Sequence, residues 1–185
     1  MIQQLVYPES QLPAHLRWQI LSFLRIEWPD GFVGQNRLRD WISREEQNPL
    51  SFVLVENDIL ISHAQVLWKY LGHAGETYNV YGLSGVFTYP AFRKQGYGRQ
   101  VVALATAYID ASDADVGIVH TRAPTKEFYS KNGWIPMEKA VTLVGSEQSP
   151  VVSDQFMLMR FVSEKGKRGR ASFEGIPLYF GEDIW

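Results

Sequence analysis

The feature that most constrains the fold is a strand, a basic glycine-containing turn and a helix that follow one another along the chain. Residues 81–87 favour a strand, and Pro90 ends it because proline cannot donate to a ladder. Residues 93–98 read RKQGYG, and apolar residues recur at helical spacing after them. Backbone N–H groups and the helix dipole attract negative charge there, and glycine lets a phosphate approach closely. We call residues 93–98 the glycine turn and predict that it binds an anion.

Details of the glycine turn separate it from other phosphate-binding loops. It lacks the Gly-Lys-Ser/Thr ending of nucleoside-triphosphate loops and the three-glycine fingerprint of dinucleotide-binding folds. It resembles the acetyl-CoA signature of the GNAT superfamily of N-acetyltransferases, Arg/Gln-x-x-Gly-x-Gly/Ala, through Arg93, Gly96 and Gly98. The alternative is an ordinary turn between strand and helix, in which the glycines give only tightness.

A second motif follows a short apolar run at residues 116–120, which suits a buried strand. Phe128-Tyr129, Gly133 and Trp134 resemble the Phe-Tyr-x-x-x-Gly-Phe/Trp helix ending of the same family. The resemblance covers residues 50–162 best. It implies a GNAT fold of the α+β class, with a central, mostly antiparallel mixed sheet of about seven strands flanked by about four helices.

The spacing of apolar residues and the positions of proline and glycine predict the remaining elements. Residues 15–28 and 36–47 have apolar positions at helical spacing. We expect further strands at residues 2–7, 51–55, 59–70, 136–143 and 155–162, with 51–70 forming a hairpin. In the family, the first two helices and their connection form one wall of the acceptor site, and here that connection contains Glu27 and Asp30.

Length and composition exclude several classes of protein. The 185 residues suit a single domain, 1–185, with residues 163–185 as a C-terminal extension docked on it. A net charge of −2 gives no field that favours nucleic acid or an anionic membrane, and no apolar run could span a bilayer. The absence of cysteine excludes disulfides and thiolate metal sites, and we expect no metal. The N-terminus lacks a signal-peptide pattern, so we expect a cytoplasmic location.

The family resemblance implies acetyl transfer from the thioester of acetyl-CoA to an amine. In the family, pantetheine pairs with backbone groups beside a bulge in the strand before the turn, and Gly85 lies where that bulge would fall. Val86, Phe87 and Thr88 would then meet pantetheine. The pyrophosphate would be held by Arg93, Lys94, Gln95, Gly96, Tyr97, Gly98 and Arg99.

Tyr129 falls where the family places its general acid, with the phenol near the thioester sulfur. A tyrosine that only packs in the core is the alternative. The general base is less defined: His120 ends the fifth strand, His63 and Glu56 are further candidates, and a chain of water molecules could replace all three.

Two positions near the expected acetyl pocket depart from the family pattern. The family commonly has Asn seven residues before the acid tyrosine and Ala four residues before it, whereas this chain has Arg122 and Thr125. Arg122 adds positive charge near the expected acceptor entrance, which would oppose a polycationic acceptor.

The C-terminal segment contains a second basic, glycine-broken run at residues 165–170, which reads KGKRGR. It lacks interleaved aromatic residues, so we predict a flexible solvated loop rather than a nucleic-acid patch. Residues 176–185 are apolar enough that we expect them to be docked rather than disordered.

The chain's ending adds a narrower resemblance, to aminoglycoside 2′-N-acetyltransferases, which end in Gly-Asp-Val-Trp. Asp183 and Trp185 match that tail, which in those enzymes helps to bind the polycationic drug. Ser84 replaces their acidic residue in the fourth strand, and Glu27 and Asp30 match their other acids loosely. Packing alone is the alternative role of the tail.

The resulting expectation is an N-acetyltransferase that transfers an acetyl group from acetyl-CoA to a primary amine, on an aminoglycoside-like or other small molecule. Two alternatives remain open: an acetyltransferase for protein N-termini or lysines, and a non-catalytic acyl-CoA-binding sensor. We expect a small-molecule amine as partner, with neither nucleic acid nor membrane, and leave open whether the chain forms a homodimer.

Overall fold

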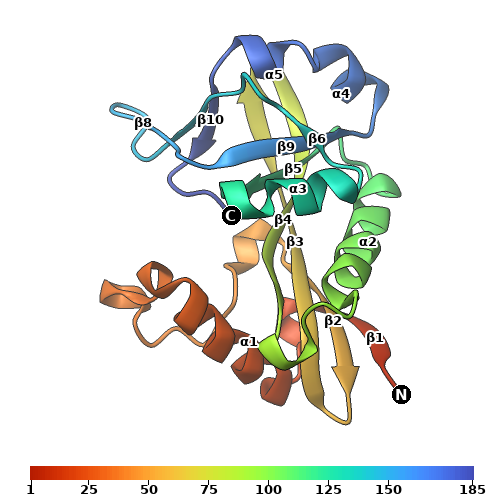
Figure 1. The fold of residues 1–185 in the computed structure, drawn as a ribbon. Coiled ribbons are helices and arrows are strands. Elements are labelled where there is room, and N and C mark those ends of the chain that lie inside the picture. Colours follow the sequence, from red (N-terminus) through yellow and green to blue (C-terminus); the bar gives the residue numbers. More distant parts are fainter. The chain divides into compact units, whose positions relative to one another are not determined.

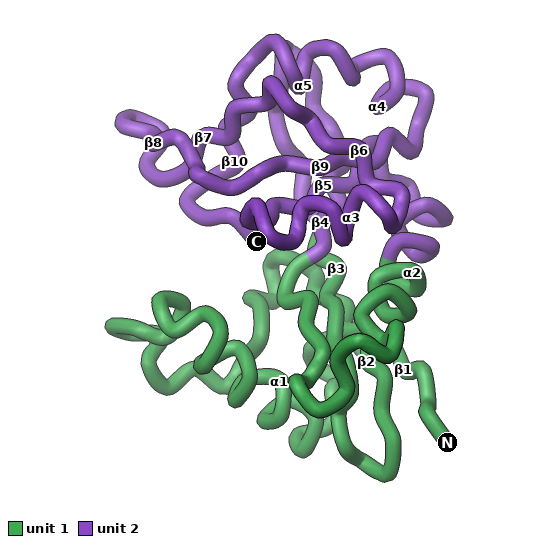
Figure 2. Tube along the Cα trace, viewed as in Figure 1, with its two compact units in different colours: residues 1–67, 84–105 green, residues 68–83, 106–185 purple.

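The computed structural model describes residues 1–185, which divide into two compact units (Figure 2). Unit 1 comprises Met1–Leu67 and Ser84–Ala105, and unit 2 comprises Trp68–Leu83 and Thr106–Trp185. Three elements contribute residues to both units: β3 (Ile59–His73), β4 (Glu76–Thr88) and α2 (Tyr97–Asp110).

The main sheet has seven strands in the order β1-β2-β3-β4-β5-β9-β6 (Figure 1). The pairs β1–β2, β2–β3, β5–β9 and β6–β9 are antiparallel, and β4–β5 is parallel. This confirms the predicted α+β class with a mixed sheet. The remaining strands of this sheet are β1 (Gln3–Pro8), β2 (Leu50–Glu56), β5 (Val116–Thr121), β6 (Ile135–Pro136) and β9 (Phe156–Phe161).

In unit 1, helix α1 (Ala14–Glu27) confirms the helix predicted at residues 15–28 and buries its apolar face. Leu16, Ile20 and Leu24 recur every four residues and lie in one core cluster with Phe87 of β4. Phe23 stacks on Phe87, with 4.1 Å between ring centroids. The end of β4 that leads into the glycine turn is therefore anchored in the core of unit 1.

The helix predicted at residues 36–47 is wrong. The segment forms only short 3₁₀ turns at Gly34–Asn36 and Glu45–Gln47. Ile42 N donates to the buried carboxylate of Glu9 at 2.9 Å, and the Arg39 guanidinium lies 4.1 Å from the Phe32 ring centroid. These tertiary contacts outweigh the weak helical propensity of the segment.

In unit 2, the core forms around β5 and β9 and includes the end of the chain. Phe173 and Phe180 are buried in the same cluster as Ile118 and Met159. Helix α3 (Ala123–Lys131) leads to Trp134, which is also buried and whose Nε1 donates to Thr106 Oγ1 at 3.1 Å.

The flexible loop predicted at residues 165–170 is also wrong, because this run forms most of helix α4 (Glu164–Gly169). Ser163 caps the helix, its Oγ accepting from Gly166 N at 3.1 Å. A Cβ on Gly166 would overlap the carbonyl oxygen of Asp115, and one on Gly169 would overlap the Tyr78 hydroxyl. The glycines allow close packing rather than flexibility.

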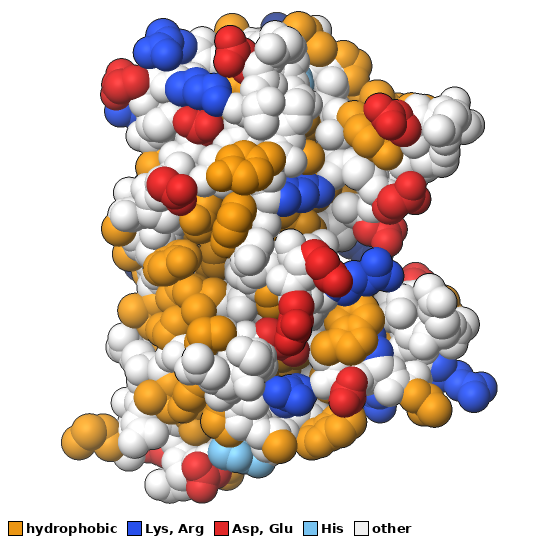
Figure 3. All heavy atoms as spheres, turned by 180° about the vertical axis from the view of Figure 1, so that it is seen from behind, with side chains coloured by type: hydrophobic (Ala, Val, Ile, Leu, Met, Phe, Trp, Pro, Cys, Tyr) orange, Lys and Arg blue, Asp and Glu red, His pale blue; other side chains and the backbone are white.

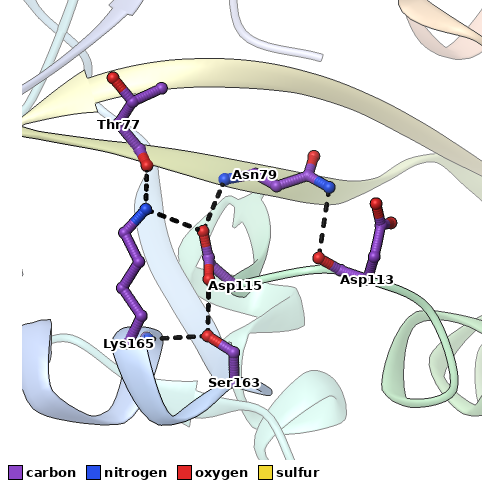
Figure 4. Close-up of polar contacts among 7 residues, drawn as sticks. Thr77, Asn79, Asp113, Asp115, Ser163 and Lys165 are labelled. Atoms are coloured by element: carbon purple, nitrogen blue, oxygen red, sulfur yellow. Dashed lines mark hydrogen bonds and ion pairs between the residues drawn. The ribbon is translucent and has the colours of Figure 1, made fainter.

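Asp115, the residue immediately before β5, anchors α4 (Figure 4). Its carboxylate accepts from Ser163 Oγ at 2.6 Å, from Asn79 N at 3.0 Å and from Lys165 Nζ at 3.3 Å. Lys165 Nζ also donates to the carbonyl of Thr77. One carboxylate thus connects α4 with β4 and β5 in unit 2.

The strand predicted at residues 136–143 is split in two. β6 pairs with β9, whereas β7 (Thr142–Val144) belongs to a second sheet of order β10-β7-β8, with β8 at Val151–Val152 and β10 at Leu178–Gly181. Ala140 N donates to Met137 O at 3.1 Å, closing a turn between the two pieces. The one-turn helix α5 (Ser172–Gly175) precedes β10, which pairs in parallel with β7.

The distribution of charged side chains on the surface and the apolar character of the helices can be compared with the composition. On the face drawn in Figure 3, acidic and basic side chains are interspersed rather than gathered by sign. No helix of the chain is long and apolar enough to cross a membrane.

Candidate active site

The glycine turn in unit 1 follows the 3₁₀ segment Pro90–Phe92, and its last two residues begin helix α2. Gln100 N donates to Gly96 O at 3.0 Å, so the N–H groups of residues 97–99 lie in the helix's first turn, where no intrahelical acceptor exists. Gly96 has φ +88°, with open space where a Cβ would lie. Lys94 also has a positive φ, 62°, which costs a non-glycine residue about 1 kcal/mol. Residues 93–96 of the turn are exposed, residues 97 and 98 are half-buried, and the geometry fits an anion such as a pyrophosphate.

The Arg93 side chain contacts other residues of unit 1. Its Nε donates to Thr88 O at 3.0 Å, and its Nη2 lies 3.5 Å from Glu27 Oε1. The structure thus joins a predicted phosphate ligand, Arg93, to a predicted acceptor ligand, Glu27. Lys94 and Arg99 are exposed, and no ion pair involves either of them.

The end of β4 holds the three residues expected to meet pantetheine. Phe87 O accepts from Ser62 Oγ at 2.7 Å, and Thr88 Oγ1 lies 2.9 Å from the same hydroxyl. The Phe87 ring is in the core, whereas Val86 and Thr88 are half-buried. Thr88 O accepts from Arg93 Nε, and because a carbonyl oxygen has two lone pairs, it can accept a second hydrogen bond.

His63, a candidate base, is fully buried beside Gly85. Its Nδ1 lies 2.7 Å from Gly85 O, and its Nε2 lies 3.3 Å from Ser51 Oγ. Burial lowers the pKa of His63 to about 4, so the ring is neutral at pH 7 and donates from Nδ1. Gly85 has φ +54°, so the chain takes a left-handed step at the position of the expected bulge. Glu56, the other candidate in this unit, pairs at the surface with the Met1 amino group at 2.9 Å.

In unit 2, the parallel ladder between β4 and β5 is short. It joins Val80 to Val116, Tyr81 to Gly117 and Gly82 to Ile118, and ends there. Residues 119–121 of β5 pair with β9.

Tyr129, the proposed acid, lies near the end of α3 and is 7% exposed. Its ring meets that of Phe128 edge-on, with 5.1 Å between centroids. Burial raises the pKa of Tyr129 well above its usual range. The phenol therefore stays neutral and can donate a hydrogen bond, but it resists full ionisation.

His120 and Lys69 lie in one cluster with Phe180. His120 Nε2 lies 3.1 Å from Thr142 Oγ1, and its ring meets Phe180 edge-on at 4.8 Å. Burial, followed by the nearby charge of Lys69, lowers the pKa of His120 to about 4. Lys69 Nζ donates to the Phe180 carbonyl and lies 3.8 Å from the Phe180 ring centroid, and burial lowers the pKa of Lys69 to about 8.

Trp185 closes this cluster. Its ring meets Phe180 edge-on at 5.0 Å and lies 4.9 Å from Lys69 Nζ. A Cβ on Gly82 would overlap the Trp185 ring, so only glycine leaves room for the indole. Asp183 is exposed.

The structure brings some predicted residues together within each unit. Arg93 meets Glu27 in unit 1, while Asp30 is exposed in the 3₁₀ turn Pro29–Phe32. Trp185 and His120 both contact Phe180 in unit 2. Ser84, on β4 in unit 1, is half-buried.

Sequence reasoning missed Lys69 and Gly82, which hold the end of the tail in place. The signal for Lys69 was a single lysine between aromatic residues in the long strand, Trp68-Lys69-Tyr70. Gly82 carried no signal, because its neighbour Trp185 lies 103 positions further along the chain.

Comparison with known proteins agrees with this geometry. The model of the acetyltransferase (GNAT) family matches residues 15–134, which is more than half of the chain. A mixed sheet that leads into an exposed glycine turn and a helix is the architecture expected of an acyltransferase. The chain belongs to the acetyltransferase (GNAT) family, whose members use acetyl-CoA. No curated protein matches its sequence.

Solved structures share the fold at low sequence identity. Escherichia coli ElaA is 17% identical, with a TM-score of 0.58 over 85% of this chain and 99% of that one. An acyl-CoA N-acyltransferase from Pseudomonas aeruginosa is 15% identical, with a TM-score of 0.57 over 86% and 99%. An aminoglycoside 6′-N-acetyltransferase complexed with coenzyme A is 14% identical, with a TM-score of 0.59 over 86% and 97%. These similarities show the fold.

Proposed function

We propose that this chain transfers an acetyl group from acetyl-CoA to a primary amine on a small molecule. The observation that carries the proposal is the glycine turn, whose exposed backbone leads into the open first turn of α2. Acetyl-CoA supplies the acetyl group as an activated thioester.

In this proposal, the cofactor is held chiefly by backbone groups. The N–H groups of residues 95–99 bind the pyrophosphate, and Lys94 and Arg99 add charge-assisted contacts. Arg93 shapes the turn through Thr88 O and Glu27 more than it binds phosphate itself. The backbone of residues 86–88 pairs with pantetheine, using the second lone pair of the Thr88 carbonyl.

Tyr129 is proposed to act on the leaving sulfur. Because burial raises its pKa, the neutral phenol persists throughout the working pH range and donates a hydrogen bond to the departing thiolate. The same shift makes complete loss of the phenolic proton costly. Tyr129 therefore stabilises the leaving group, and the thiolate takes its proton from solvent at a later stage.

His120 is proposed to receive the proton that the attacking amine loses. With its pKa lowered to about 4, it is neutral at pH 7 and has a free ring nitrogen, yet it holds a proton only weakly. This low proton affinity of His120 suits a group that passes the proton on to water, rather than a base that keeps it.

The acceptor is proposed to be a small molecule with few amines. The Asp183-Ile184-Trp185 ending supports an aminoglycoside-like acceptor, and exposed Asp30 and Asp183 could each contact an amine. Glu27 is partly neutralised by Arg93, and the Lys69 ammonium beside the Trp185 ring repels a polycation. We therefore favour a singly charged amine over an aminoglycoside, with Ser84 as a neutral hydrogen-bonding residue.

Isothermal titration of CoA against Gly96→Asp tests the cofactor assignment. An aspartate there adds strain and a charge that repels phosphate, so binding should be lost. Gly75→Asp is the matched control, because Gly75 also has a positive φ, 82°, and open space around it, but lies in the β3–β4 turn. Equal CoA affinity in the two folded variants would exclude the glycine turn as the phosphate site.

Tyr129→Phe tests the catalytic role, because it keeps the packing and removes only the hydroxyl. Turnover should fall by about 10²-fold, as expected for the loss of one hydrogen-bond donor to a developing negative charge, while CoA affinity stays unchanged. An acetyl-CoA turnover screen across amine classes provides the acceptor for this assay. CoA binding without turnover of any amine would instead support a non-catalytic sensor.

A further inference from the structure

A cavity of 370 Å³ lies in unit 2, where α2 ends and where β6, β9 and α4 meet. Its volume falls within the range typical of small-molecule sites, about 300–1,000 Å³. Part of its lining comes from Lys167 and Arg170, which belong to the basic run at residues 165–170. The proposed acetyl transfer assigns no role to these residues.

One wall of the cavity is a fixed arginine. Arg160 Nε and Nη2 donate to the two carboxylate oxygens of Asp110 at 2.8 and 2.6 Å, and Nη1 donates to Gly133 O at 2.9 Å. This two-point pair holds the guanidinium in place. Arg160 therefore forms a fixed part of the wall, and its charge is already paired with that of Asp110.

The lining also contains two cations that are held less firmly. Arg170 has no ion pair, and its guanidinium lies 5.5 Å from the Phe161 ring centroid. Lys167 pairs with Glu164 at 2.7 Å, three residues earlier on α4, and both side chains are more than half exposed. A pair so exposed contributes little to stability, so Lys167 can turn toward a ligand at small cost.

The cavity also has an apolar surface. Ile135 and Phe161 line it, and both are half-buried. Apolar area beside two available cations suits a molecule with one anionic end and one apolar body.

We propose that this cavity is a second binding site, for a small organic anion whose carboxylate or phosphate contacts Arg170 and Lys167 and whose apolar part rests on Ile135 and Phe161. The site goes beyond the proposed acetyl transfer and depends on none of its residues. An inorganic phosphate lacks the apolar part and binds more weakly than an aryl phosphate of the same charge.

The test follows backbone amide resonances of the ¹⁵N-labelled full chain during titration with four probes, each added separately to a phosphate-free buffer. Phenyl phosphate and benzoate should shift the amides of Gly133 and Ile135. Benzylamine, which has the same ring and the opposite charge, should leave them unchanged. Inorganic phosphate should shift them only at higher concentration than phenyl phosphate.

Two matched variants locate the charge. Arg170→Ala should weaken phenyl phosphate binding by roughly tenfold or more, because it removes a charged hydrogen-bond donor. Arg168→Ala removes the same charge from an exposed position on α4 outside the lining, and should change binding by less than about twofold. Lys167→Ala, a third variant that tests the other proposed cation independently, should weaken binding by a few-fold.

Three outcomes would overturn the proposal. The amides of Gly133 and Ile135 could fail to shift at about 10 mM phenyl phosphate, a concentration far above the Kd of a useful site. Arg170→Ala and Arg168→Ala could weaken binding equally, which would mean that the anion follows overall charge. The shifts could also be confined to Gly96 and Gly98, in which case the probe binds only the glycine turn, and the proposed function would stand without the second site.

Discussion

Two basic segments of this chain each have two glycines among six residues, yet they use those glycines for different purposes. In the glycine turn, RKQGYG, the first four residues are exposed, and Gly96 takes a positive φ with open space around it. The run KGKRGR forms helix α4, where Gly166 and Gly169 allow backbone and ring atoms to approach. In the first segment glycine is needed for its dihedral angle, and in the second for its missing side chain.

The largest expected effect is that of Gly166→Ala. The new Cβ would overlap the Asp115 carbonyl and lie 3.1 Å from Val116 Cγ1, so backbone must move. We expect a loss of about 3 kcal/mol or more in unfolding free energy, which lowers the Tm by about 6–12 °C. Thermal unfolding measures it. A Tm within 2 °C of the parent, on the order of the shift from 1 kcal/mol, would show that α4 is loosely attached.

Asp115→Asn should have the next largest effect. Burial opposes ionisation of Asp115, but hydrogen bonds from Ser163, Asn79 and Lys165 together lower its pKa. The unfolded carboxyl binds protons more readily, so this stabilisation is present above the ordinary pKa of 3.8 and disappears as pH falls through the lower folded pKa. We expect a loss of about 2 kcal/mol at pH 7.

Denaturant unfolding at several pH values checks the Asp115 prediction. The stability difference between parent and variant should be constant near neutral pH and shrink in the acid range below about pH 4. If the stability difference between parent and variant stays unchanged down to about pH 2, the charge of the carboxylate does not stabilise α4.

Gly96→Ala should have a smaller effect on stability and a selective one on binding. Alanine fits the space but not the φ, which costs about 1–2 kcal/mol and favours relaxation of the glycine turn. We expect CoA affinity to fall in this variant, whereas Gly166→Ala, measured below its Tm, should keep it. If Gly166→Ala lost CoA affinity and Gly96→Ala kept it, the cofactor would be bound by residues 165–170 rather than by the glycine turn.

Lys94→Asn should change stability least. Lys94 has φ 62°, and asparagine tolerates the left-handed region better than lysine does. Stability should stay within about 0.5 kcal/mol of the parent, while CoA affinity falls more at low salt than at high salt. An affinity loss that does not depend on salt would mean that Lys94 acts through backbone geometry rather than charge.

The sequence predicted well those features whose partners lie nearby. Leu16, Ile20 and Leu24 share one face through helical spacing alone, and the glycine turn is defined by consecutive residues. The failures all depend on distant partners. Ile42 donates to Glu9, Gly166 packs on Asp115, and residues 178–181 pair with β7, and none of these contacts leaves a local pattern.

The candidate site divides in the same way. Gly96 and Tyr129 were found from short motifs, although their roles stay predictions. Lys69 was missed because its character depends on Phe180, a residue 111 positions away, whose carbonyl and ring it contacts. The lowered pKa of His120 likewise comes from burial and from Lys69, which its own neighbours in sequence do not reveal.

The same lysine has a chemical consequence. With a pKa of about 8, Lys69 is an uncharged amine in roughly one molecule in ten at pH 7, whereas an ordinary lysine of pKa 10.4 is uncharged in fewer than about one in a thousand. An uncharged amine is a nucleophile, and acyl thioesters are electrophiles. Lys69 is half-buried, so where a small reagent reaches it without displacing Phe180 and Trp185, it keeps the lowered pKa and should take up acetyl groups or amine-reactive labels ahead of exposed lysines. Mass spectrometry after brief labelling checks this. Labelling no faster than at exposed lysines would mean that the end of the chain must first lift, which removes the burial and restores the ordinary pKa.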